Sequence, residues 1–155
     1  MSVFDPEAFL DATINETFET KYPLVPDDEY EAILGEPIVF VGLSKEKGEP
    51  YAKLTIPYLI DDLKVEQATG LKMITVRQQF FLQAEFHPDG SIARLLNGPG
   101  KNIKLGRVRA AVGQENPPWN MRMLNGSGPV RVKVRIGLAQ DKVTEVNEVV
   151  NVAKI

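Results

Sequence analysis

Apolar and polar residues alternate along several segments of this chain, and a period of two predicts β-strands with one buried face. The clearest case runs from Gly128 to Leu138, where Val and Ile alternate with the cations Arg131, Lys133 and Arg135. This strand is expected to bury its apolar face and to expose a cationic row. The row is either an ordinary solvent face or a surface that holds a negatively charged ligand.

Two earlier segments have the same period. An apolar run that ends in IVFVGL predicts a first long strand, bent where Gly35 and Pro37 interrupt it. A polar loop at 44–50 leads into a second strand, residues 51–60, in which Pro57 should end regular pairing or mark an edge. These two strands are expected to form a hairpin.

The longest strand candidate covers residues 73–86. One set of its alternate positions is mainly apolar, and the other is polar except for Phe81. An HPDG turn and a short return strand, SIARLL, follow it. The last strand is predicted at residues 143–155, after the cationic strand and a turn near AQDK.

Two segments have helical signals. Asp5 as a cap and Pro6 at the first helical position predict a short helix over residues 6–12. A second helix is predicted at 101–114, with Asn102 as its cap and an apolar stripe formed by Leu105, Val108 and Val112.

Five strands with one helix between the third and the fourth are typical of an OB-fold, a small Greek-key barrel. We therefore predict a mainly β chain that forms an OB-like five-stranded Greek-key barrel with a short N-terminal helix. Residues 1–27 are expected to form that helix and an acidic arm, and residues 28–155 the barrel. OB-folds bind oligonucleotides on strands 2 and 3 and through the adjacent loops.

Composition narrows the class of protein. The 155 residues include no cysteine, which excludes disulfides and thiolate chemistry. The N-terminal residues lack the pattern of a signal peptide, and no apolar run approaches the roughly 18 residues of a membrane span. We therefore expect a cytoplasmic protein with no membrane partner.

The net charge of −3 conceals an asymmetry along the chain. Residues 1–50 contain 12 acidic and 3 basic side chains, whereas residues 51–155 contain 9 acidic and 15 basic ones. Such a division indicates an anionic partner, or an acidic segment that covers a basic surface.

Catalytic motifs are not found. The Gly100-Lys101 pair lacks the remainder of a phosphate-binding loop, and His87 lies in a turn without a second histidine or a cysteine. The acidic clusters Asp27 to Glu29 and Asp61-Asp62 lie in polar segments and are interpreted as solvated carboxylates. We expect no enzyme activity, no cofactor and no metal.

Single-stranded nucleic acid requires cations for phosphates and flat side chains on which bases stack. Phe81 has two interpretations. It stacks a base, or it is covered by the N-terminal arm or by a dimer interface. Trp119 either stacks a base or covers the end of the barrel. The predicted nucleic-acid-binding residues are Lys45, Lys47, Tyr51, Lys53, Arg77, Phe81, Lys101, Lys104, Arg107, Trp119, Arg131, Lys133 and Arg135.

A resemblance adds to this interpretation. The segments MSVFDPEAFLDATINETFETKYPLVPDDEYEAIL, KNIKLGRVRAAVG, LNGSGPVRVKVRIG and TEVNEVVNVAKI resemble a family of phage-encoded, OB-fold-like single-stranded DNA-binding proteins. The resemblance implies protection of single strands during phage DNA replication and recombination in the host cytoplasm.

The partners that follow are single-stranded DNA, a second copy of the chain, and replication or recombination proteins that meet the acidic N-terminal region. The same acidic residues have two other interpretations. They compete with DNA for the basic surface, or they are solvated residues packed around the barrel. The alternative function is a non-enzymatic protein-interaction or virion-associated β-barrel module.

Overall fold

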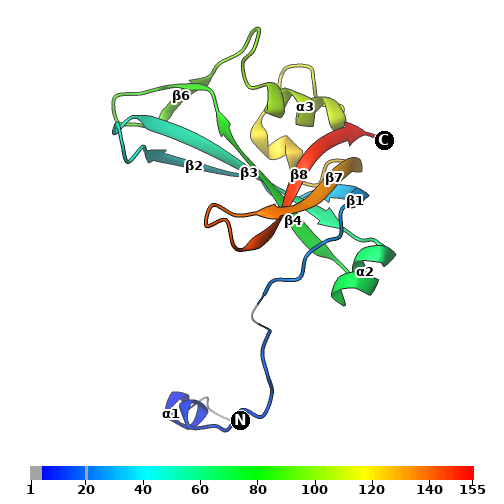
Figure 1. Ribbon diagram of the computed structural model, residues 1–155. Coiled ribbons are helices and arrows are strands. Elements are labelled where there is room, and N and C mark those ends of the chain that lie inside the picture. Colours follow the sequence, from blue (N-terminus) through cyan, green and yellow to red (C-terminus); the bar gives the residue numbers. More distant parts are fainter. Residues whose placement is uncertain (1–4, 20) are drawn as a thin grey trace.

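A computed structural model describes residues 5–19 and 21–155 of the chain (Figure 1). The prediction of a mainly β protein is confirmed, and every strand pairing within the described part is antiparallel. In chain order the elements are α1 (Pro6–Leu10), β1 (Asp28–Leu34), β2 (Ile38–Leu43), β3 (Pro50–Ile60), α2 (Leu63–Thr69), β4 (Ile74–Leu82), β5 (Ala84–Phe86), β6 (Ile92–Leu95), α3 (Ile103–Ala111), the 3-10 helix η1 (Met121–Leu124), β7 (Val130–Leu138) and β8 (Glu145–Lys154).

The main sheet is organised around the long strand β3. One edge of β3 pairs with β4, and its other edge pairs with β2 near the start and β1 near the end. β1 also pairs with β7, which pairs with β8, while β5 and β6 form a separate hairpin. β1 and β2 therefore follow one another along β3 as two halves of a single bent strand, as the interruption at Gly35 and Pro37 predicted.

The predicted count of five strands is wrong, because the described residues form eight. The first predicted strand is divided into β1 and β2 at Gly35 to Pro37, and both parts run antiparallel to β3. The third is divided after Leu82 into β4 and β5, and the return strand is β6. Gly35 and Pro37 had indicated a bend at the first division, whereas alternation of polarity continues through the second, so the period of two did not reveal the second.

Of the two expectations for Pro57, an end of regular pairing is wrong, because β3 continues through it to Ile60 and pairs with β4 there. The missing N–H of Pro57 lies where β1 has ended and β2 has not begun, so little pairing is lost there. Gly35 donates its N–H to the Pro57 carbonyl at 2.8 Å. A Cβ at position 35 would lie 2.9 Å from Pro57 Cγ, so this close approach requires glycine.

The core lies on one face of the sheet. Alternate side chains of β3, from Ala52 to Ile60, are fully buried and meet the buried valines of β7 and the apolar stripe of α3. Tyr58 is the largest of them, and its hydroxyl donates to Gln78 Oε1 at 2.7 Å. Burial raises the pKa of Tyr58, so this hydroxyl stays protonated and keeps its donor role.

The main sheet is not closed into a barrel. β2, β4 and β8 each have one edge that pairs with no strand in the described part of the chain. β4 and β8 nevertheless lie close to each other, with α3 beside β8 (Figure 1). A cleft lined by residues of β4, β8 and α3 lies beside this approach, where an ordinary barrel would have continuous strand pairing.

The helices differ in how well their ends were predicted. α1 begins at Pro6 with the Asp5 carboxylate accepting from Glu7 N–H, and it ends two residues earlier than expected. α2 was not predicted, and the Asp62 carboxylate caps it by accepting from Lys64 N–H. No helix in the described residues combines the length and apolarity that crossing a bilayer requires.

Asn102 does not cap α3 with its side chain, which corrects the sequence interpretation. Its backbone is left-handed, at φ 49°, and its amide is used elsewhere. Asn102 Oδ1 accepts from Gln83 N–H, and Nδ2 donates to the carbonyls of Gln83 and Leu96. The side chain therefore ties the start of α3 to the end of β4.

Candidate nucleic-acid interface

An aromatic cluster lies on the outer face of β2, β3 and β4. Phe40, Lys53 and Phe81 are directly opposite one another across the three strands, and Tyr51 lies between the two phenylalanines. The Tyr51 ring is 6.1 Å from that of Phe40, and 5.8 Å from that of Phe81 in an edge-to-face arrangement. Phe40 and Phe81 are 57% and 68% exposed, so their rings are open to a ligand.

Lys53 gives this cluster a positive charge. Phe40 and Phe81 stand on either side of it in the register, and the described residues supply no ion-pair partner for its ammonium group. Rings offer flat surfaces to nucleobases, and the ammonium group offers a charge to phosphate. We name the set Phe40, Tyr51, Lys53 and Phe81 the aromatic face.

Gly42 allows the rings to lie against the backbone. A Cβ built on it would be 2.9 Å from Phe40 Cε1 and 3.0 Å from the Tyr51 hydroxyl oxygen. A side chain at this position would therefore displace one or both rings. The glycine is part of the geometry of the aromatic face.

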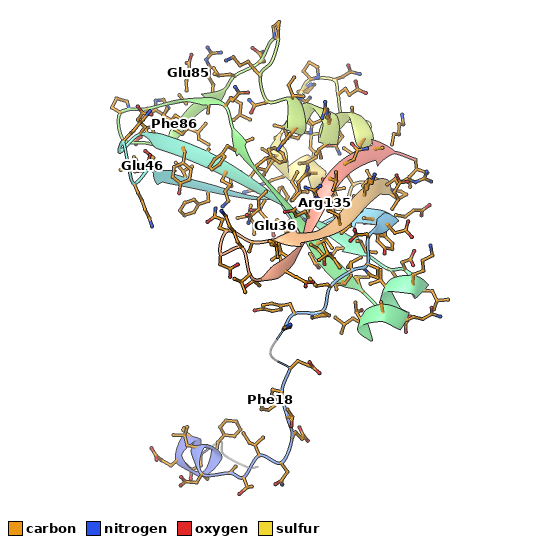
Figure 2. The ribbon with its side chains drawn as sticks, in the orientation of Figure 1. Phe18, Glu36, Glu46, Glu85, Phe86 and Arg135 are labelled. Atoms are coloured by element: carbon orange, nitrogen blue, oxygen red, sulfur yellow. The ribbon has the colours of Figure 1, made fainter. Side chains whose placement is uncertain are left out.

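The loop between β2 and β3 extends the aromatic face at the Tyr51 end. Ser44 orders this loop, because its hydroxyl accepts from the N–H groups of Lys47 and Glu49. Lys45 and Lys47 are exposed, as an interface with phosphate requires. The same loop also carries Glu46 and Glu49, so its net charge is zero (Figure 2).

Another group of predicted site residues lies around the cleft between β4 and β8. Arg77 of β4 and Lys104 and Arg107 of α3 line this cleft, which has a volume of about 1370 Å³. Lys101 lies just before α3 and is exposed. The structure therefore separates these cations from the aromatic face, except that Arg77 and Phe81 share the outer side of β4.

The cationic row of β7 has carboxylates beside it. Arg131 stands opposite Glu31 of β1, and Lys133 stands opposite Glu29. Arg135 forms an ion pair with Glu148 of β8, with 2.8 Å between Nε and Oε2. Side chains directly opposite in antiparallel strands are neighbours, so this face is close to electrically balanced. Of its two interpretations, the geometry favours an ordinary solvent face.

Trp119 lies against the core and not free on a loop. It is partly buried, and its indole N–H donates to Gln114 Oε1 at 2.8 Å. The Arg109 guanidinium lies 4.3 Å from the ring centroid, as in a cation–π contact. One face and the polar atom of the ring are therefore occupied within the protein, which favours the interpretation that Trp119 covers the core.

The sequence interpretation missed Phe40 and Gly42. Both lie in an apolar run without polar alternation, so the period of two did not assign their side chains to a face. The hairpin offered a signal, because the loop at 44–50 fixes which β2 residues oppose Tyr51 and Lys53. Counting back from that loop identifies both positions.

No group of three or more His, Asp or Glu side chains that could hold a metal ion occurs in residues 5–19 and 21–155. The side chains of the aromatic face, Phe40, Tyr51, Lys53 and Phe81, offer stacking, hydrogen bonding and charge attraction. Comparisons with protein-family models, with curated proteins and with solved structures give no match for this chain.

Proposed function

We propose that this protein binds single-stranded DNA on the aromatic face, without strong sequence preference and without catalysis. The single observation that carries the proposal is the exposed cluster of Phe40, Tyr51 and Phe81 around Lys53. Base stacking on an aromatic side chain contributes about 1–3 kcal/mol per base and tolerates any base. Lys53, Lys45 and Lys47 are the cations in reach of the backbone of a strand that crosses these rings.

The sheet is proposed to be an OB-like fold opened at one side. In support, β1 and β2 behave as one bent first strand, and β3, β4, β7 and β8 follow in the order of the remaining four OB strands. The helix α3 falls between the third and fourth of these, as in an OB-fold. Tyr51, Lys53 and Phe81 are then on strands 2 and 3, where OB-folds bind oligonucleotides, and Phe40 is on strand 1 beside them.

The cellular role that we propose is protection of single strands during phage DNA replication and recombination in the host cytoplasm. It rests on the resemblance of the N-terminal, central and C-terminal segments to the phage family. The cationic row of β7 is no part of the proposed site, because Glu29, Glu31 and Glu148 stand beside it.

Fluorescence anisotropy with a labelled oligo-dT of about 30 nucleotides tests the proposal, since an OB-fold occupies about 4–16 nucleotides. The wild type should bind the single strand more tightly than a duplex of equal length. Phe81→Ala should weaken binding about fivefold or more, because stacking of one base is lost. Binding that does not distinguish single strand from duplex would overturn the proposal.

Two variants of one residue isolate stacking from general apolar contact. Phe81→Trp keeps a flat ring and should retain affinity, whereas Phe81→Leu keeps an apolar side chain and should lose affinity as Phe81→Ala does. The triple variant Arg131, Lys133, Arg135→Ala is the matched electrostatic control. It should leave affinity within about twofold, because the carboxylates beside the row already neutralise it.

A protein-interaction module is the second candidate, and the outer edge of β2 favours it. Among the described residues no strand pairs with this edge, and Ile38, Phe40 and Leu43 are exposed along it. An apolar edge strand offers unpaired backbone groups to another chain. Val41→Lys would block such pairing and leave the aromatic face in place, so loss of a protein partner without loss of single-strand binding would identify this function.

A further inference from the structure

The cleft lined by β4, β8 and α3 gathers cations that the proposed DNA site does not use. Four cations line it, and none of them has an ion pair or a side-chain hydrogen bond among residues 5–19 and 21–155. Of the two carboxylates in the lining, Glu148 is already paired with Arg135. The cleft therefore has a net positive charge, which favours an anionic ligand. The lining cations are Lys21, Arg77, Lys104 and Arg107.

The cleft is larger than a pocket for one small molecule. Its volume is about 1370 Å³, whereas pockets for small molecules are usually about 300–1,000 Å³. Its walls come from two strands, one helix and the segment 21–24. A segment of an anionic polymer fits such a space better than a single small anion.

Tyr22 gives the cleft a flat side chain in addition to its charge. The residue lines the cleft next to Lys21, and it is 92% exposed. Among the described residues no other ring lies against it. A free aromatic ring stacks on any nucleobase, whereas an acidic protein would need only the cations. Together, the ring and the cations favour nucleic acid as the polymer.

The outer side of β4 connects the cleft to the aromatic face. Phe81, Gln79 and Arg77 occupy alternate positions of β4 and point to the same side of the sheet. Gln79 and Arg77 also line the cleft, so the cleft begins two residues from Phe81. The distance along the strand from Phe81 to Arg77 is about 13 Å. A single strand that leaves Phe81 along β4 therefore reaches Arg77 within about four nucleotides, even at the close phosphate spacing of a duplex.

We propose that a single strand bound on the aromatic face continues along β4 into this cleft. There Arg77, Lys104 and Arg107 hold its phosphates, and Tyr22 stacks a base. Lys104 and Arg107 are three residues apart on α3, which places their Cβ atoms about 5–6 Å apart on one side of the helix. The two side chains can therefore contact neighbouring phosphates. This inference rests on the proposed function, because it concerns the same ligand.

Fluorescence anisotropy with oligo-dT of two lengths tests the inference. An oligonucleotide of about six nucleotides covers the three rings and ends near Arg77, whereas one of about 16 extends to α3. Lys104→Ala with Arg107→Ala defines the cleft variant, in which both substituted side chains are exposed in the wild type. It should weaken binding of the longer oligonucleotide about tenfold and leave binding of the shorter one within about twofold.

Salt dependence gives a second measurement on the same variant. For the longer oligonucleotide, the slope of log K against log salt should become shallower by about 1.4, because each phosphate contact on a single strand contributes about 0.7. Arg122→Ala with Lys154→Ala is the matched control. It removes two exposed cations that lie outside the cleft lining, and it should change neither affinity nor slope.

Two variants of Tyr22 test stacking in the cleft. Tyr22→Ala should weaken binding of the longer oligonucleotide about fivefold or more and leave the shorter one unchanged. Tyr22→Phe keeps the ring and should bind both lengths as the wild type does. Equal losses in the two variants would contradict stacking on this side chain.

Phe81→Ala separates the inference from the proposed function. It should weaken binding of both lengths, because both begin on the aromatic face. If Phe81→Ala weakens both and the cleft variant weakens neither, the aromatic face binds DNA and the inference about the cleft is overturned. If the wild type binds neither length, the proposed function fails and the inference fails with it.

Labelled poly-glutamate of about 16 residues tests the other class of anionic partner. It should bind the wild type at least about tenfold more weakly than the longer oligonucleotide, because it has no base to stack on Tyr22. Poly-glutamate binding as tight as that of the oligonucleotide, and lost in the cleft variant, would assign the cleft to an acidic protein and overturn the proposal.

Discussion

Two parts of the outer surface look alike in sequence and differ in the structure. The β7 face presents three cations at alternate positions, and β3 presents Tyr51 and Lys53 of the aromatic face in the same alternation. On β7 the neighbouring strands supply carboxylates to the cations. On β3 the neighbouring strands supply two phenylalanines to a lysine.

The difference shows that the character of a strand face is decided by its neighbours. Glu29 and Glu31 are about a hundred residues away in sequence from the cations that they oppose. A count of charges within the β7 segment alone therefore gives a net positive charge that the folded surface does not have. Lys53, by contrast, is a single cation without a carboxylate opposite it in the register. β3, which has one outward cation where β7 has three, is therefore the better candidate for binding phosphate.

The largest effect is expected from removing both central rings of the aromatic face. Tyr51→Ala with Phe81→Ala should lower single-strand affinity about thirtyfold or more, since two stacking contributions of about 1–3 kcal/mol are lost. Fluorescence anisotropy measures this. The thermal midpoint should change little, because both side chains lie on the outer face. An affinity within twofold of the wild type would remove the aromatic face from consideration.

Gly42→Ala displaces the rings without deleting them. The added Cβ would meet Phe40 Cε1 at 2.9 Å, so the rings must shift, and single-strand affinity should fall about fivefold, near 1 kcal/mol. Gly106→Ala is the control, because a Cβ there meets nothing within 4 Å. This control should stabilise α3 by about 1 kcal/mol and leave binding unchanged. Equal losses in both variants would contradict the role of Gly42.

Removing carboxylates from beside the β7 face should leave its cations without opposing charges, as Lys53 is on the aromatic face. Glu29→Gln with Glu31→Gln leaves Arg131 and Lys133 without opposing charge, and single-strand affinity should rise about threefold, with a steeper salt dependence. The measurement is anisotropy at several salt concentrations. Unchanged affinity and slope would show that these carboxylates do not neutralise the row.

Acid should lower the stability of the protein in part by protonating Asp28, which lies on β1 beside the β7 face. The pKa of Asp28 lies below its ordinary value of 3.8, because Glu29 N–H and Lys64 donate to its carboxylate. A folded-state pKa below the unfolded one stabilises the protein above about pH 3.8, and this contribution is lost as the pH falls through the folded value. The thermal midpoint should therefore decline below about pH 4, and less steeply in Asp28→Asn. Parallel curves for the two proteins would contradict this assignment.

Much of the secondary structure followed from local signals. Alternation identified β3, β4, β7 and β8, and Asp5 and Pro6 identified the start of α1. α2 was missed because its start depends on Asp62, which was interpreted only as a solvated carboxylate in a polar segment. Pro57 was misjudged because its effect depends on the gap between β1 and β2, a long-range property of the sheet.

The candidate site was only partly predictable, for the same reason. Tyr51, Lys53 and Phe81 were found from their strand parity, and the structure brings them together through the β3–β4 register. Trp119 could not be assigned, because its partners Arg109 and Gln114 approach it through the turn after α3. Local sequence identified side chains of suitable chemistry, and strand pairing determined which of them are neighbours.

The side chain of Asn102 has a further consequence for motion. Its amide joins Gln83 and Leu96 to the start of α3, and with the direct hydrogen bond from Leu96 N–H to the Gln83 carbonyl it closes the segment that contains β5 and β6. Segments attached in this way open as cooperative units, with a free energy below that of global unfolding. The amides of residues 84–95 should therefore exchange hydrogen together, earlier than those of β3. Asn102→Ala should speed the exchange of these amides further and leave that of the main sheet unchanged.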